Sequence, residues 1–189
     1  MNRLKQKYYQ ELQDKLMSRL KLSNKMAVPK VCKIVLNIGV SKPDDARERK
    51  KVIDNVSKQF ATITGQKPQM TKAKKAISEF SLQQGDPLGV TVTLRGEKMW
   101  QFLDKLISIV LPRVKDFRGT SRTAFDGQGN YSLGLEEQIV FPEINYDEIE
   151  SIRGLQINII TSTRDDAQAY ELLEILGMPF EKEEPVIKQ

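Results

Sequence analysis

The chain of 189 residues contains no histidine and one cysteine, Cys32. Without histidine it cannot build a Ser-His or Cys-His catalytic pair or an imidazole metal site. A single cysteine excludes an internal disulfide and a cysteine-rich zinc site. No run of about 18 apolar residues is present, so the sequence predicts no membrane span. The first ten residues lack the apolar stretch of a secretory signal, and we therefore expect a cytoplasmic protein.

The charged residues are distributed unevenly along the chain. Residues 1–75 carry 19 Lys or Arg and 6 Asp or Glu, a net charge of +13, whereas residues 131–189 carry 4 and 13, a net charge of −9. The whole chain has a formal net charge of +5. The basic segment indicates a surface for a polyanion, either a nucleic acid or an anionic membrane.

Helical periodicity predicts a helix at each end of the chain. Near the N-terminus the apolar residues recur every four positions, and we expect this helix to dock on its own domain. Its stripe consists of Leu4, Tyr8, Leu12, Leu16 and Leu20. The last helix is predicted to begin at Thr163, where Asp166 has capping-box spacing, and to end at Gly177.

Two further helices are predicted in the middle of the chain. One follows Pro43, with Asp45 and Glu48 at capping-box spacing, and ends at Gly65. The other covers residues 99–110 and stops before Pro112. In the helix that follows Pro43, the basic residues are interpreted as lying outside the apolar stripe. They are Arg47, Arg49, Lys50, Lys51 and Lys58.

Alternating residues predict the strands. In residues 30–40 one face carries Cys32 and the even-numbered apolar residues, so Cys32 is expected in the core, while Lys33 and Asn37 lie on the opposite face. Residues 90–95 alternate in the same way and turn Thr93 and Arg95 outward. Shorter strands are expected around 68–71 and 155–159, and residues 113–134 read as a long ordered loop.

These elements predict an α+β fold: a single domain with a mostly antiparallel sheet, helices packed on one face, the other face open for RNA, and long functional loops. We expect this domain to cover residues 1–180, with a charged tail over residues 181–189.

The motifs of common enzyme sites are missing from the sequence. The Gly-x-Gly of Asp126–Asn130 lacks a third spaced glycine and is interpreted as a turn, and no phosphate-binding P-loop motif is present. Acidic residues between Glu136 and Glu150 could hold a divalent cation, but a solvated or docking face is the better interpretation. We expect no enzyme activity, no cofactor and no metal.

An open polar sheet face remains as the candidate site. Lys33, Asn37, Thr93 and Arg95 are expected there, beside the flexible lysines 72, 74 and 75. Amides and hydroxyls bind phosphate and ribose oxygens, and cations supply long-range attraction. Few aromatic residues are available for base stacking, so folded, largely double-stranded RNA is favoured. An ordinary solvated sheet face is the alternative.

Several long segments resemble the bacterial large-subunit ribosomal protein L5 family. The similarity is collinear from about residue 4 to Phe180. The segments that carry it are Val28–Val40, Ile63–Lys75, Gly89–Trp100, Arg113–Gly119, Phe125–Ser132 and Phe141–Ile144.

The resemblance implies a structural ribosomal protein that binds 5S rRNA and helps attach it to the large subunit in the central protuberance. Its partners would be 5S rRNA, large-subunit rRNA and neighbouring 5S-associated proteins. In the family the concave polar sheet face grips the 5S rRNA backbone, and the contacting residues fall on Asn37, Gln66 and Thr93. The full expected rRNA-binding set is Lys33, Asn37, Gln66, Thr71, Lys72, Lys74, Lys75, Thr93 and Arg95.

Two further contacts are implied by the resemblance. The family's loop that reaches P-site tRNA corresponds to residues 73–86, with Ala76, Ser78, Gln83, Gln84 and Gly85 facing the tRNA. Gln83 and Asp86 depart from the family pattern, which has a basic residue and a tyrosine there. A bridge to the basic small-subunit head protein S13 is expected to use Arg113, Arg118, Glu143, Asp147 and Glu148. The alternatives are a non-ribosomal RNA-binding module or RNA chaperone, a membrane-surface protein, and a carboxylate metalloenzyme.

Overall fold

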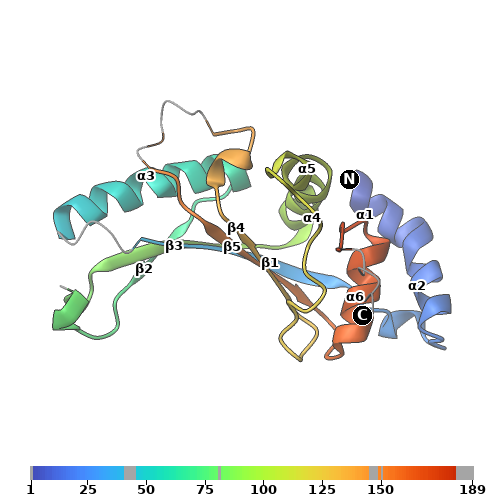
Figure 1. Ribbon diagram of the computed structural model, residues 1–189. Coiled ribbons are helices and arrows are strands. Elements are labelled where there is room, and N and C mark those ends of the chain that lie inside the picture. The colour runs from blue at the N-terminus through green and yellow to red at the C-terminus, as the bar shows by residue number, and fades with distance from the viewer. Residues whose placement is uncertain (1, 41–45, 81, 145–148, 150, 182–189) are drawn as a thin grey trace, which may run out of the picture. The chain divides into compact units, whose positions relative to one another are not determined.

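The computed structural model describes residues 2–40, 46–80, 82–144, 149 and 151–181 (Figure 1). The chain has an α+β fold with a five-stranded antiparallel sheet in the strand order β2-β3-β1-β5-β4, as the sequence predicted. In chain order the elements are α1 (Arg3–Lys7), η1 (Tyr8–Leu12), α2 (Gln13–Arg19), η2 (Lys25–Ala27), β1 (Val31–Gly39), α3 (Ala46–Thr64), β2 (Gln69–Lys72), η3 (Ser78–Phe80), β3 (Pro87–Leu94), α4 (Gly96–Lys105), η4 (Leu106–Val110), α5 (Leu111–Arg113), β4 (Tyr131–Leu135), η5 (Gln138–Val140), β5 (Leu155–Thr161) and α6 (Asp166–Ile175). Within the described residues, no helix has the length and apolarity needed to cross a membrane.

The chain divides into two compact units. The sheet unit comprises Lys33–Met99 and Gly134–Asn158, and the helical unit comprises Met1–Cys32, Trp100–Leu133 and Ile159–Gln189. The expected limit of the domain at Phe180 stays a prediction, since residues 182–189 lie outside the described part of the chain.

The core of the sheet unit forms between α3 and one face of the strands. The apolar stripe of α3 is buried at Ile53, Val56, Phe60 and Ile63, and α3 lies along β2 and β3 (Figure 1). The facing positions of the strands are also buried: Ile34, Leu36, Ile38, Val90, Val92 and Leu94. Burying each such side chain stabilises the fold by about 1.5–3 kcal/mol. Gly65, with a φ of 61°, ends α3 as predicted.

The N-terminal helix packs within the helical unit, as its periodicity predicted. Leu4, Tyr8, Leu12 and Leu16 are buried, whereas Leu20 is only half-buried. The helix is α-helical at both ends, with a π-helical turn, η1, in the middle. The Tyr8 hydroxyl donates to the Pro29 carbonyl at 2.7 Å, and burial, followed by the neighbouring Tyr9, raises the pKa of Tyr8.

Two helix ends differ from the prediction. The third predicted helix continues through Pro112: the π-helical turn η4 runs directly into α5, and the backbone at Val110 and Leu111 keeps right-handed helical angles. The last helix begins at Asp166 with Asp165 as its N-cap, and the Asp165 carboxylate accepts from Ala167 N at 3.0 Å. Thr163 lies before this N-cap, outside the helix, and its Oγ1 accepts from Asp165 N at 3.1 Å.

The predictions for Cys32 and Arg49 were wrong. Cys32 is half-buried, because strict alternation begins only at Ile34, the first residue of β1 that pairs with β3. Arg49 is 1% exposed, because it stands four residues before Ile53 and seven before Val56 and therefore lies on the buried stripe of α3, not outside it. Its guanidinium Nη1 lies 3.8 Å from Asp86 Oδ2, and an arginine with a carboxylate partner tolerates burial that a lone cation does not. The predicted cap residue Asp45 is outside the described residues.

Candidate RNA interface

One face of the sheet unit carries polar side chains, and we call it the polar face. It arises because every second strand residue points away from α3. Its residues are Lys33, Val35, Asn37 and Gly39 of β1, Gln69 and Thr71 of β2, Gly89, Thr91 and Thr93 of β3, and Gln156 and Asn158 of β5. All except Gly89 are half-buried or exposed, whereas the alternate positions from Ile34 to Ile38, from Val90 to Leu94 and from Leu155 to Ile159 are buried.

The strand register brings two predicted contact residues together. In the antiparallel β1–β3 pair, Asn37 stands opposite Thr91 and Val35 stands opposite Thr93. Asn37 and Thr93 are therefore diagonal neighbours on the same face, a spacing of roughly 7–8 Å in such pairs. Asn37 is half-buried and Thr93 is exposed. One molecule that lies across the two strands can contact both side chains.

Gln66 also lies beside this pair. Its Nε2 donates to the Thr93 carbonyl oxygen at 3.1 Å, which holds the amide at the edge of β3. The adjacent turn is fixed by Lys98, whose Nζ donates to the Gly65 carbonyl at 2.5 Å. Nothing in the local pattern of the sequence indicated this position for Gln66, because the contact spans 27 residues of chain.

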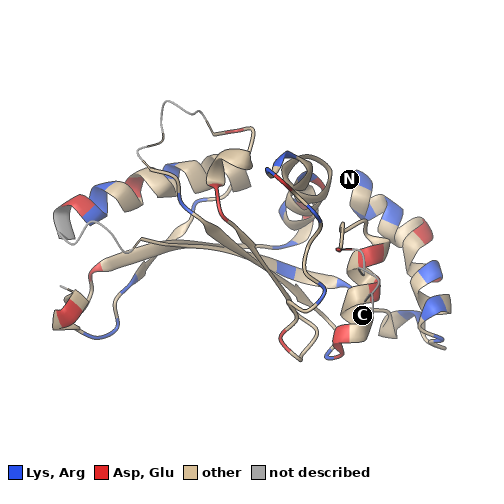
Figure 2. Ribbon diagram, in the orientation of Figure 1, with Lys and Arg blue, Asp and Glu red and all other residues tan. Residues whose placement is uncertain are grey.

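Basic residues surround the polar face. Lys33 belongs to β1 and Arg95 directly follows β3. Three lysines stand in close succession at and after the end of β2: Lys72, Lys74 and Lys75. Arg95 and the three lysines are exposed, and Lys33 is half-buried. Figure 2 shows the turn after β2 as a basic stretch. Thr71 stands opposite Gly89 and joins the polar face at the same end.

The predicted tRNA-facing loop is a hairpin with an ordered base. Ala73 N donates to the Asp86 carbonyl at 2.8 Å, and Gly85 N donates to the Ala73 carbonyl at 3.0 Å. The Asp86 carboxylate accepts from Gln83 N at 2.9 Å and also faces Arg49. The five predicted tRNA-facing residues are all exposed: Ala76, Ser78, Gln83, Gln84 and Gly85. The tip exposes Phe80 at 62%, which sequence reasoning had not singled out.

The predicted bridge residues are divided between the units. Arg113 and Arg118 are exposed in the helical unit, and Glu143 is half-buried in the sheet unit. Asp147 and Glu148 lie outside the described residues. The bridge set therefore stays a prediction.

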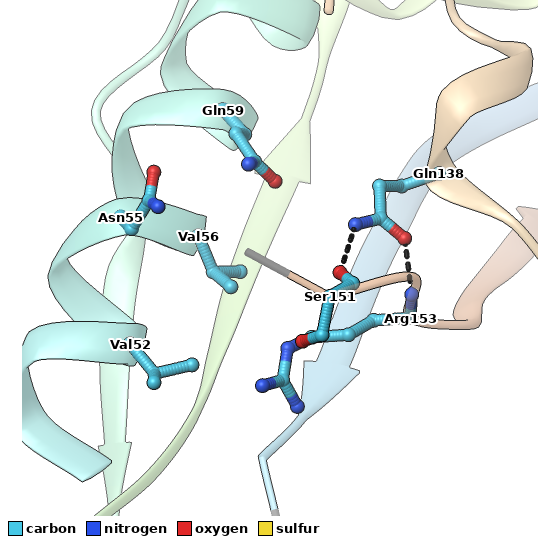
Figure 3. A pocket seen from close by; sticks show the side chains of 7 residues that line it. All are labelled: Val52, Asn55, Val56, Gln59, Gln138, Ser151 and Arg153. Carbon is cyan, nitrogen blue, oxygen red and sulfur yellow. Dashed lines mark hydrogen bonds between the residues drawn. The ribbon is translucent and has the colours of Figure 1, made fainter. Parts of the chain in front are cut away.

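A small cavity lies beside α3 in the sheet unit. The Gln138 amide on its wall is held in place, since Nε2 donates to the Ser151 carbonyl at 2.9 Å and Oε1 accepts from Arg153 N (Figure 3). The cavity of about 10 Å³ has room for about one water molecule and none for a metabolite. It is lined by Val52, Asn55, Val56, Gln59, Gln138, Ser151 and Arg153.

The region of Asp126–Asn130 is a turn, as predicted. The Asp126 carboxylate accepts from Gln128 N at 2.8 Å and from Asn130 Nδ2 at 2.7 Å. These bonds, led by the one from the Asn130 side chain, lower the pKa of Asp126. The N–H groups of Gly127 and Gly129 donate to the Asp166 carboxylate at 3.0 and 2.7 Å, so they are already used and the turn offers no cradle for a dinucleotide.

Two family models match nearly consecutive parts of the chain. The model of ribosomal protein L5 matches residues 24–83, and the model of the C-terminus of the ribosomal L5 family matches residues 87–180. The chain belongs to the ribosomal L5 family. The matched range contains the polar face, the hairpin of residues 73–86 and the buried Arg49.

Membership of this family establishes the general role of the chain. The L5 family consists of large-subunit ribosomal proteins that bind 5S rRNA, and its role is structural rather than enzymatic. A ribosomal protein of this family is located in the cytoplasmic ribosome and binds rRNA.

Proposed function

We propose that the chain binds 5S rRNA through the polar face and helps attach it to the large subunit in the central protuberance. The observation that carries the proposal is the position of Asn37 and Thr93 side by side on an uncovered face, with Gln66 hydrogen-bonded to Thr93. Neutral amides and hydroxyls position an RNA backbone, and the surrounding lysines and arginines release its counterions.

The experiment measures 5S rRNA affinity of Asn37→Ala and Thr93→Ala. Each loses hydrogen bonds to RNA, and we expect affinity to fall about threefold to tenfold per variant, from about 0.5–1.5 kcal/mol for each bond. Both variants should unfold at the wild-type temperature, because the two side chains lie on the open face. Gln10→Ala, an exposed amide of the N-terminal helix, is the control and should bind normally. Wild-type affinity of both face variants would refute the proposed interface.

We further propose that the hairpin of residues 73–86 contacts P-site tRNA. Support comes from the exposed apolar side chains of Ile77 and Phe80 near its tip, which follow the exposed lysines 72, 74 and 75 in the sequence. Apolar rings and cations together suit a nucleic acid whose bases or riboses are accessible. Large subunits that carry a hairpin shortened by residues 76–84 should retain 5S rRNA and bind P-site tRNA more weakly. Unchanged tRNA affinity would contradict this contact.

A bridge to the basic small-subunit head protein S13 is the third proposed contact. The net charge of −9 over residues 131–189 supports it, because opposite charge favours docking across a moving interface. Charge reversal by Glu143→Lys should weaken association of the subunits at low salt. Subunit association that is equal to wild type at every salt concentration would argue against the bridge.

A further inference from the structure

Nothing in the described part of the chain requires glycine at position 39. It is the last residue of β1, lies on the polar face two positions after Asn37, and is exposed. Its φ is outside the left-handed region, and a Cβ placed there would meet no atom of the described chain within 4 Å. Glycine weakens a strand, and in a strand it often marks a place where another molecule approaches the backbone closely.

Gly89, which stands opposite Gly39, has a structural reason. A Cβ at Gly89 would overlap the Ile38 carbonyl oxygen, so the β1–β3 pair itself requires glycine there. Gly89 is also buried, and the Thr71 hydroxyl lies 3.2 Å from the position of that Cβ. Of the two facing glycines, Gly39 is therefore the one where the described chain leaves room for a side chain and the sequence has none.

The side chains around this gap differ in what they can offer. Thr91 stands opposite Asn37 and diagonally from Gly39. Its hydroxyl donates to the Leu36 carbonyl at 3.0 Å, so its hydrogen is used and Oγ1 is left as an acceptor. An ionised phosphate has no hydrogen to give, whereas a ribose 2′-hydroxyl does. Thr91 therefore suits a ribose, and Asn37 can donate to a phosphate.

We propose that the ribose edge of one RNA strand packs directly on the backbone at Gly39, with its 2′-hydroxyl donating to Thr91 Oγ1. This inference rests on the proposed function and specifies which part of the RNA the polar face recognises. The missing side chain at Gly39 lets the sugar reach the sheet, and the Asn37 amide holds the adjacent phosphate. The site thus selects a ribonucleotide backbone over a deoxyribonucleotide one.

The steric part is tested with Gly39→Leu and a matched control, Gly134→Leu. Gly134 is an exposed glycine of β4 whose Cβ would likewise meet no described atom within 4 Å. Gly39→Leu should keep the wild-type melting temperature and lose 5S rRNA affinity about tenfold or more, since a side chain then fills the sugar's place. The control should bind within about twofold of wild type. Binding of Gly39→Leu within about twofold of wild type would overturn the inference.

The ribose part is tested with Thr91→Val and Thr91→Ser, combined with single 2′-deoxy substitutions in 5S rRNA. Valine removes the acceptor and serine keeps it, so only valine should weaken binding, about threefold to tenfold. One 2′-deoxy position should weaken wild-type and Thr91→Ser binding by a similar factor and leave Thr91→Val binding unaffected, as coupled partners do. If every deoxy effect is the same in both variants, Thr91 does not contact a ribose.

The outcomes separate this inference from the proposed function. If Asn37→Ala and Thr93→Ala weaken binding but Gly39→Leu and Thr91→Val do not, the polar face binds RNA and the ribose contact is refuted. If none of these variants changes the affinity, the proposed interface fails and the inference fails with it.

Discussion

The salt dependence of RNA binding tests directly which side of the sheet unit meets the RNA. The perturbation is the triple variant Lys72→Gln, Lys74→Gln and Lys75→Gln, which removes three exposed cations from the turn beside the polar face. Each cation that neutralises a phosphate adds about 0.7–0.9 to the slope of log affinity against log salt. If all three contact phosphates, the slope should fall by about 2–3.

This change is large enough to measure by filter binding or fluorescence anisotropy. Between ~50 and ~200 mM salt, a slope lower by about 2–3 means that the variant loses at least about tenfold less affinity than wild type. Asn37→Ala should behave differently, because a neutral amide releases no counterion. Its affinity should fall by the same factor at every salt concentration, with an unchanged slope.

The matched control removes three cations from α3. Lys50, Lys51 and Lys58 are exposed, belong to the same unit, and lie on the helix that covers the opposite face of the sheet. Replacing all three with Gln changes the net charge equally and should leave the slope within about 0.5 of wild type, as distant charges are screened. If the α3 control lowers the slope as much as the turn variant, RNA does not lie on the polar face.

Three predictions concern the stability of the fold. Tyr8→Phe should lower the free energy of unfolding by about 1 kcal/mol at neutral pH, because the hydrogen bond to the Pro29 carbonyl is lost. In urea unfolding this difference from wild type should shrink above pH ~10, since the raised pKa of Tyr8 keeps the folded phenol protonated while the unfolded phenol ionises. A constant difference would contradict burial of the phenol. Asp86→Ala should cost about 1–3 kcal/mol by denaturant unfolding because it removes a carboxylate that faces the buried Arg49 guanidinium, whereas Arg49→Met should cost less; the reverse order would contradict the ion pair. Gly89→Ala should lower stability by about 2 kcal/mol or more in thermal unfolding, and Gly39→Ala should not; equal effects would refute the distinction between the two glycines.

Short-range patterns predicted the elements better than the contacts between them. The apolar stripe of the N-terminal helix and the alternation of residues 90–95 indicated the right element and the right buried side, because both signals repeat within a few residues. The end of α3 followed from Gly65 alone. Pro112 misled the prediction, since a preceding π-helical turn let the helix continue.

The candidate site was predictable only in part, for the same physical reason. Alternation put Asn37 and Thr93 on outward positions of their own strands, but it could not say which residues face each other. The burial of Arg49 could have been read from α3, because position 49 continues the stripe of Ile53 and Val56. Its carboxylate partner could not, since Asp86 stands 37 positions later in the sequence.

By itself, the sequence determined the class of fold, the basic character of its first 75 residues and, through the resemblance, the family. Local periodicity and charge are properties of residues close together in the sequence, so they do not depend on how the strands are paired. Only the tertiary structure decided that Asn37 pairs with Thr91, that Gln66 is held at Thr93, and that Gly39 is open while Gly89 is closed. Those facts depend on the register of distant strands, which is fixed when the whole apolar face is buried against α3.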